Sequence, residues 1–138
     1  MFALSAPSLT SRRVAAPVST SAVPATLFGL LGLPIPCTFT VPSLLACIAQ
    51  DEDCPELAVT ELAPFNSRRR SLVAYTGAQY RLLIDRTSNV ARVFDSLKDP
   101  REQTDLADSQ PALLRKLTKQ ATAWDLRYCV DHAPLRGD

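Results

Sequence analysis

Glycine and histidine are scarce in this chain, with four glycines and one histidine (His132) among 138 residues. Four scattered glycines do not form the glycine-rich loop with which nucleotide-binding proteins hold phosphate groups. The single histidine has no serine or cysteine near it in the pattern of a catalytic triad. The sequence therefore argues against two common kinds of enzyme site.

An excess of charge and a long apolar run are also missing. The chain has 15 Lys and Arg against 14 Asp and Glu, a formal net charge of +1. Nucleic acids and anionic membranes are recognised through broad basic surfaces, so neither is expected as a partner. No apolar run approaches the ~20 residues that span a bilayer. The N-terminus lacks the pattern of a signal peptide, because its arginines follow the apolar start, and the default expectation is a cytoplasmic location.

The four cysteines lack the paired spacing of a zinc site. Cys37, Cys47, Cys54 and Cys129 form no C-x-x-C pair, so we expect no metal ligand among them. A Cys37–Cys54 or a Cys47–Cys54 disulfide would fit an oxidising compartment. Partly buried thiols without a disulfide are the plainer interpretation.

Two short charged runs interrupt the chain. The acidic run 51–53 reads as a solvated loop and not as a cation site. The basic run 68–70 also reads as a solvated loop. The alternative for the basic run is a contact with a phosphate or sulfate group.

From Leu57 onward the pattern predicts an antiparallel sheet followed by a helix. Short segments rich in β-forming residues alternate with turn residues, which suits four strands in meander order. The predicted strands are Ala58–Leu62, Ser71–Tyr75, Tyr80–Asp85 and Ala91–Asp95. Pro111–Tyr128 has one apolar stripe at helical spacing, which should cover the sheet. The stripe is Leu113, Leu114, Leu117, Ala121, Trp124 and Tyr128. Asp108 or Ser109 is the expected N-cap.

The first 50 residues predict one or two helices. Thr20 or Ser21 can cap a helix that ends at Gly32, with Pro34 preventing its continuation. The expected buried stripe of this helix is Val23, Leu27, Leu30 and Leu31. A second apolar stretch, Thr38–Ile48, has its leucines and Ile48 on one side.

The segment Ala91–Asp108 contains, in order, Phe94-Asp95, Leu97, Asp99-Pro100, Glu102 and Asp105-Leu106-Ala107. These residues resemble the pattern Tyr-Asp-Leu, Asp-Pro-x-Glu, Asn-Leu-Ala near the C-terminus of sulfatases. Sulfatases belong to the alkaline-phosphatase-like hydrolases. Further resemblance lies in Tyr80–Ile84 and in an earlier segment, at Pro17-Val18-Ser19, Thr26-Leu27, Leu30, Gly32 and Pro34. Ala22 departs from the family, which usually has aspartate there.

The resemblance implies an α+β fold: a small antiparallel four-stranded sheet packed by a C-terminal helix, preceded by one or two helices. Residues 1–50 would be the end of the sulfatase catalytic α/β domain and 51–129 the C-terminal subdomain. Residues 130–138 read as a disordered tail.

The same resemblance implies that this chain lacks the family's catalytic groups. Sulfatases use a Cys/Ser-x-Pro-x-Arg nucleophile and usually calcium, with ligands upstream of the region that this chain resembles. Ser5-Ala6-Pro7-Ser8 imitates the nucleophile motif, but Leu9 stands where the arginine is required. We therefore expect no catalytic, cofactor-binding or metal-binding residue in this chain, and no sulfatase activity from it alone. The expected partner is the missing catalytic domain, and the alternative function is a free-standing protein-interaction module.

Overall fold

A computed structural model describes residues 13–39, 41–50, 57–63 and 70–128, together with the single positions 4, 7, 9, 11 and 54. The chain forms two compact units, Met1–Glu56 and Leu57–Asp138. The expected tail 130–138, His132 and Cys129 lie outside the described residues. The assignment of residues 1–50 to a catalytic domain stays a prediction.

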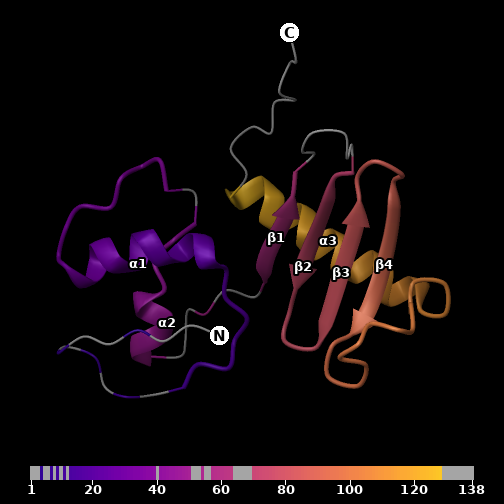
Figure 1. The fold of residues 1–138 in the computed structure, drawn as a ribbon, viewed down its shortest axis with the longest axis horizontal. Coiled ribbons are helices and arrows are strands. Elements are labelled where there is room, and N and C mark those ends of the chain that lie inside the picture. The colour runs from indigo at the N-terminus through magenta and orange to yellow at the C-terminus, as the bar shows by residue number, and fades with distance from the viewer. Residues whose placement is uncertain are drawn as a thin grey trace, which may run out of the picture. The chain divides into compact units, whose positions relative to one another are not determined.

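The first unit is helical. A 3-10 helix, η1 (Thr20–Ala22), continues into α1 (Val23–Leu30), and α2 (Leu45–Gln50) follows (Figure 1). Pro24 occupies the first turn of α1, where its missing N–H costs no helical hydrogen bond. The predicted caps are wrong, because Thr20 is already helical and no side-chain hydrogen bond caps η1 or α1. The continuous η1–α1 run begins at Thr20, so Ser19 occupies the N-cap position.

The C-terminal end of α1 is where the sequence predicts it. Gly32 has φ +65°, and its N–H donates to the Gly29 carbonyl at 3.1 Å. The Leu33 N–H donates to the Phe28 carbonyl at 2.9 Å. These two bonds make a Schellman motif, which satisfies carbonyls at the helix end and requires a left-handed residue. Glycine adopts that conformation without a steric penalty.

The predicted leucine stripe of α1 is not its buried side. Leu27 and Leu31 are 42% and 71% exposed, whereas Ala22, Ala25 and Thr26 are almost fully buried. The Thr26 hydroxyl accepts a hydrogen bond from the Leu44 N–H at 2.9 Å and donates to the Ala22 carbonyl at 2.7 Å. A Cβ on Gly29 would lie 2.6 Å from Leu45 Cδ1. The segment entering α2 therefore packs on the small residues of α1, because only short side chains permit this approach.

The second unit contains the predicted antiparallel sheet. Its strands are β1 (Ala58–Leu62), β2 (Leu72–Thr76), β3 (Tyr80–Asp85) and β4 (Val90–Asp95), in the order β1-β2-β3-β4. The register pairs Thr60 with Ala74, Ala74 with Leu83, and Leu83 with Arg92. The prediction of an α+β fold with a four-stranded meander is confirmed, with strand ends displaced by at most one residue.

Helix α3 (Pro111–Tyr128) covers one face of the sheet, behind the strands in Figure 1. Its apolar side chains from Leu113 to Trp124 share a cluster with alternate residues of the strands, as the stripe predicts, and the side chain of Tyr128 lies outside the described structure. The cluster contains Leu57, Val73, Tyr75, Leu82, Val93 and Ala121, with Leu113, Leu114, Leu117 and Trp124 against it. The predicted cap is wrong, because the Ser109 hydroxyl donates to the Leu106 carbonyl and the helix begins at Pro111.

Within the described part of the chain, no helix is both long enough and apolar enough to cross a membrane.

Candidate functional site

The sulfatase-like segment 91–108 is organised by carboxylates that accept backbone hydrogen bonds. Asp95, at the end of β4, is 8% exposed and accepts from the N–H groups of Leu97 and Lys98, at 3.1 and 3.0 Å. Gln79 Nε2 donates to its other oxygen at 2.9 Å. The Lys98 N–H is the main cause that holds the pKa of Asp95 below its ordinary value, since donors favour the charged form. Asp95 thus closes the turn after β4.

The Asp99-Pro100 turn uses two further acidic residues. Asp99 Oδ2 accepts from the N–H groups of Gln103 and Thr104, at 2.7 and 2.8 Å. Glu102 is left-handed, with φ +54°, and its carboxylate pairs with Arg81 Nη1 at 2.7 Å. An ion pair between β3 and this turn offsets the cost of a strained non-glycine residue.

Asp105 fixes the end of the segment to β4. Its Oδ1 accepts from the N–H of Val93 at 3.0 Å and from the N–H of Ala107 at 2.9 Å. The Leu106 N–H donates back to the Val93 carbonyl at 2.8 Å. Val93 is fully buried, so its backbone groups depend on these partners. Asp95, Asp99 and Asp105 therefore each accept backbone hydrogen bonds that hold the segment in its conformation.

A polar cluster holds α3 on the sheet. The Tyr75 hydroxyl contacts both carboxylate oxygens of Asp125, at 2.8 and 2.7 Å. Arg86 pairs with Glu61 at 2.7 Å and lies 3.9 Å from Asp125. Burial, followed by the hydrogen bond to Asp125, raises the pKa of Tyr75. The phenol therefore stays a neutral donor over the physiological pH range.

Two surfaces of the described chain leave apolar side chains exposed. The first, here called the α1 apolar surface, comprises Leu27, Leu31, Leu33 and Ile35, which are 42 to 71% exposed. The second is the face of the sheet opposite α3, here called the open sheet face. It carries exposed Leu62 and Val90 and half-buried Leu72 and Leu83. Exposed apolar groups gathered on one surface are typical of interaction sites.

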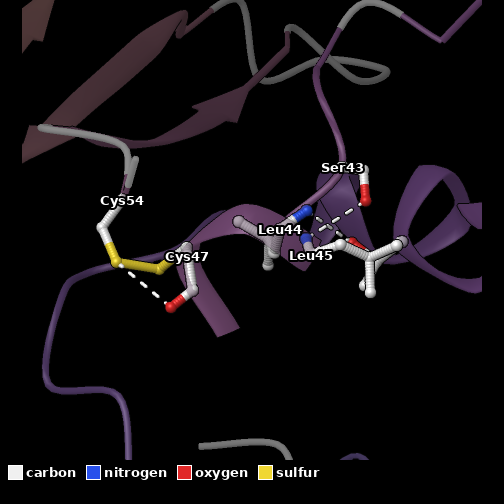
Figure 2. The surroundings of a disulfide bond; sticks show 6 residues. Ser43, Leu44, Leu45, Cys47 and Cys54 are labelled. Carbon is white, nitrogen blue, oxygen red and sulfur yellow. Dashed lines mark hydrogen bonds between the residues drawn. A yellow bond between two sulfur atoms is a disulfide. The ribbon is translucent and has the colours of Figure 1, made fainter. Parts of the chain in front are cut away.

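A disulfide joins Cys47 of α2 to Cys54 (Figure 2). This is one of the two pairings that the sequence allows, and the interpretation of thiols without a disulfide is wrong for this pair. The Cα atoms lie 4.5 Å apart, within the range for disulfides. Cys37 is a free, exposed thiol. Sequence reasoning had no signal to choose between the pairings, because both need only a short loop.

Several residues considered in the sequence lie outside the described structure. They include Ser5 and Ser8 of the false nucleophile motif, the acidic run 51–53, and Arg68 and Arg69. Among the residues that the structure describes, no group of three or more His, Cys, Asp and Glu is placed to hold a metal ion. The expectation of no site residue in this chain stays a prediction.

No protein-family model and no curated protein matches this chain. Solved structures do resemble it. One is a protein named as a sulfatase from Bacteroides thetaiotaomicron, with 21% identity and a TM-score of 0.63, matched over 82% of this chain and 25% of its own. Another is yidJ from Bacteroides fragilis, named as a sulfatase, with 18% identity and a TM-score of 0.64, over 75% and 24%.

A third is the phosphonate monoester hydrolase from Silicibacter pomeroyi, with 17% identity and a TM-score of 0.64, over 80% of this chain and 25% of its own. The chain thus spans about a quarter of the length of the structures it matches. At identities this low, TM-scores of 0.63 and 0.64 show a shared fold and nothing finer. The fold of this chain is that of a portion of a sulfatase, consistent with the C-terminal one.

Proposed function

We propose that this chain is the C-terminal portion of a sulfatase-like hydrolase, and that it acts as a structural, cleft-shaping part of that enzyme. One observation carries the proposal: the chain reproduces a quarter of sulfatase structures in fold. The internal use of Asp95, Asp99 and Asp105 supports it, because carboxylates that hold the backbone are not free for chemistry. The nucleophile and the calcium ligands would belong to the remainder of the enzyme.

The α1 apolar surface suits contact with that remainder. Leu31 is 71% exposed and Leu33 and Ile35 are nearly half exposed, although all three follow a helix whose other side is packed. Burying one such side chain contributes roughly 1.5–3 kcal/mol. Four of them would favour docking onto an apolar surface of a catalytic domain.

The test of the catalytic assignment is an activity assay on the purified chain. We expect no hydrolysis of 4-nitrophenyl sulfate above the buffer rate, with or without added calcium. Calcium-dependent hydrolysis by a preparation free of other sulfatases would refute the assignment. Activity that appears only after addition of a separately produced sulfatase catalytic portion would support it.

The test of the docking role is a double substitution, Leu27→Gln with Leu31→Gln. The intact chain should bind a hydrophobic dye, and the variant should bind less of it and capture less of the catalytic portion. Leu126→Gln is the matched control, because Leu126 is 84% exposed but belongs to α3 of the other unit. Equal capture by the variant and the intact chain would exclude this surface.

A free-standing interaction module is the second candidate. Its support is the second unit, whose sheet and α3 share their own apolar core and are held by the contact between Tyr75 and Asp125. A module adapted to exist alone should be monodisperse and should melt cooperatively without dye binding. A sulfatase portion separated from its partner should bind dye or aggregate.

A further inference from the structure

A shallow hollow of about 60 Å³ lies on the open sheet face, where β2 begins and β3 ends. It is lined by Arg70, Leu72, Leu83, Asp85, Ser88, Val90 and Arg92. Strand register explains the grouping, because Leu72 pairs with Asp85 and Asp85 with Val90, while Leu83 pairs with Arg92. Residues at alternate strand positions share one face, so the apolar floor and the charged rim belong to the same surface.

Arg70 is held in place on the rim of this hollow. Its Nε donates to Asp85 Oδ2 at 2.9 Å. Asp85 is itself fixed, because its Oδ1 accepts from the N–H groups of Thr87 and Ser88 at 3.0 and 3.2 Å. Within the described part of the chain, neither Nη nitrogen of Arg70 has a hydrogen-bond partner. The guanidinium thus keeps two oriented donor groups for a ligand.

Arg92 supplies a second guanidinium. It is exposed, and it makes no ion pair or hydrogen bond with any residue that the structure describes. Arg81 and Arg86 differ, because each pairs with a carboxylate at 2.7 Å. Two arginines against the one carboxylate of Asp85 leave the hollow with a formal charge of +1.

The chemistry of this hollow suits a small oxyanion. A guanidinium group presents its N–H groups in a planar fork that matches sulfate, phosphate and carboxylate oxygens. Half-buried Leu72 and Leu83 keep water from one side of the hollow, which favours attraction between the arginines and an anion. At about 60 Å³ the hollow has room for one small anionic group.

We propose that the hollow between Arg70 and Arg92 binds a single oxyanion group, such as a sulfate ester group carried by a ligand. The binding chemistry stands on the hollow alone. The choice of sulfate as the biological source rests on the proposed function. Such a site would hold an acidic ligand at a point away from the reacting bond.

The direct test is equilibrium dialysis of the whole chain with labelled inorganic sulfate, at constant ionic strength kept with chloride. We expect saturable binding of one sulfate per chain. Arg92→Gln and Arg70→Gln should each weaken it by roughly tenfold or more, the usual effect of losing a charge-assisted hydrogen bond. Arg115→Gln, an exposed change on α3 with the same loss of charge, should leave it unchanged.

A second measurement separates this site from general effects of salt. Sulfate stabilises most proteins by exclusion from their surface, so a rise in melting temperature that Arg92→Gln retains does not count as binding. Competition with phosphate and with acetate identifies which oxyanion is preferred. Absence of saturable binding, or equal binding by Arg92→Gln and Arg115→Gln, would overturn the proposal.

The two proposals can fail separately. Sulfate binding through Arg92 without capture of a catalytic portion would support the oxyanion site and refute the proposed function. Capture and restored activity without sulfate binding would refute only the oxyanion site. Amide NMR shifts confined to residues 70–72 and 83–92 on sulfate addition would locate the bound ion.

Discussion

Asp105 shows at the scale of one residue how the segment 91–108 is held to the sheet. A single carboxylate oxygen accepts hydrogen bonds from the N–H groups of Val93 and Ala107. One acceptor thus ties a strand to the segment that leads into α3. Without it, the buried N–H of Val93 would have no such partner, which is costly inside a protein.

We expect Asp105→Ala to lower the free energy of unfolding by about 1–3 kcal/mol, the cost of leaving the N–H of buried Val93 without its acceptor. Urea unfolding followed by tryptophan fluorescence measures this change, since Trp124 packs against the affected core. Asp108→Ala is the control, because it removes a second exposed aspartate of the same segment. Equal losses in the two variants would show that Asp105 has no special role.

Asp95 predicts a dependence of stability on pH. Backbone N–H groups, led by that of Lys98, hold its folded pKa below the ordinary value of 3.8. A group whose pKa is lowered by folding stabilises the protein above its unfolded pKa and loses that contribution as the pH falls through its folded pKa. The contribution of Asp95 is therefore complete at neutral pH and declines below about pH 4.

The variant Asp95→Asn should be less stable than the intact chain at pH 7, and the difference should shrink as the pH falls below about 4. Urea unfolding across a series of pH values measures it. Asp108→Asn should follow the intact chain throughout. If the difference in free energy of unfolding between Asp95→Asn and the intact chain stays constant with pH, the negative charge of Asp95 does not cause it.

At the scale of elements, α3 is the part that turns the sheet into a stable unit. Its half-buried leucines meet the strands, while Leu126 near its end is 84% exposed. The helix therefore has leucines both on the side that faces the sheet and on the side that faces solvent. Contact with the sheet, and not helix propensity, should decide how much each leucine contributes to stability.

We expect Leu117→Ala to cost about 2 kcal/mol in the free energy of unfolding, because it removes apolar volume from the contact between helix and sheet. Leu126→Ala should change it by less than about 0.5 kcal/mol. Both variants make the same chemical change in the same helix, so their difference isolates packing. Similar costs would mean that α3 is not anchored through this stripe.

At the scale of the whole molecule, the disulfide acts on one unit. Cys47 and Cys54 are separated by seven positions, and both belong to the unit Met1–Glu56. Closing a loop of this length removes chain entropy from the unfolded state worth about 2.5 kcal/mol. The second unit contains neither cysteine of this pair.

Cys47→Ser should therefore lower the stability of the first unit by about 2.5 kcal/mol and leave the second unit unchanged. Hydrogen exchange, read separately for α1 and for β2 to β4, measures the two effects. Cys37→Ser should change neither, because Cys37 is a free and exposed thiol. Faster exchange in β3 of the Cys47→Ser variant would contradict independent units.

The sequence alone predicted the elements that depend on local pattern. The four strands, the bounds of α3 and the end of α1 at Gly32 follow from alternation, helical spacing and a glycine that accepts a positive φ. These signals lie within a few residues of the structure they specify. The resemblance of segment 91–108 to sulfatases has the same local character.

The tertiary structure decided which side of α1 is buried, which cysteines pair and which distant residues meet. The sequence predicted the leucine side of α1 as its buried side, but the approach of Leu44 and Leu45 buries the side with Ala25, Thr26 and Gly29. It also offers two cysteine pairings, and the fold brings Cys47 to Cys54. The hollow between Arg70 and Arg92 joins residues 22 positions apart through strand register. Contacts between distant residues leave no periodic signal in a sequence, so only the folded chain reveals them.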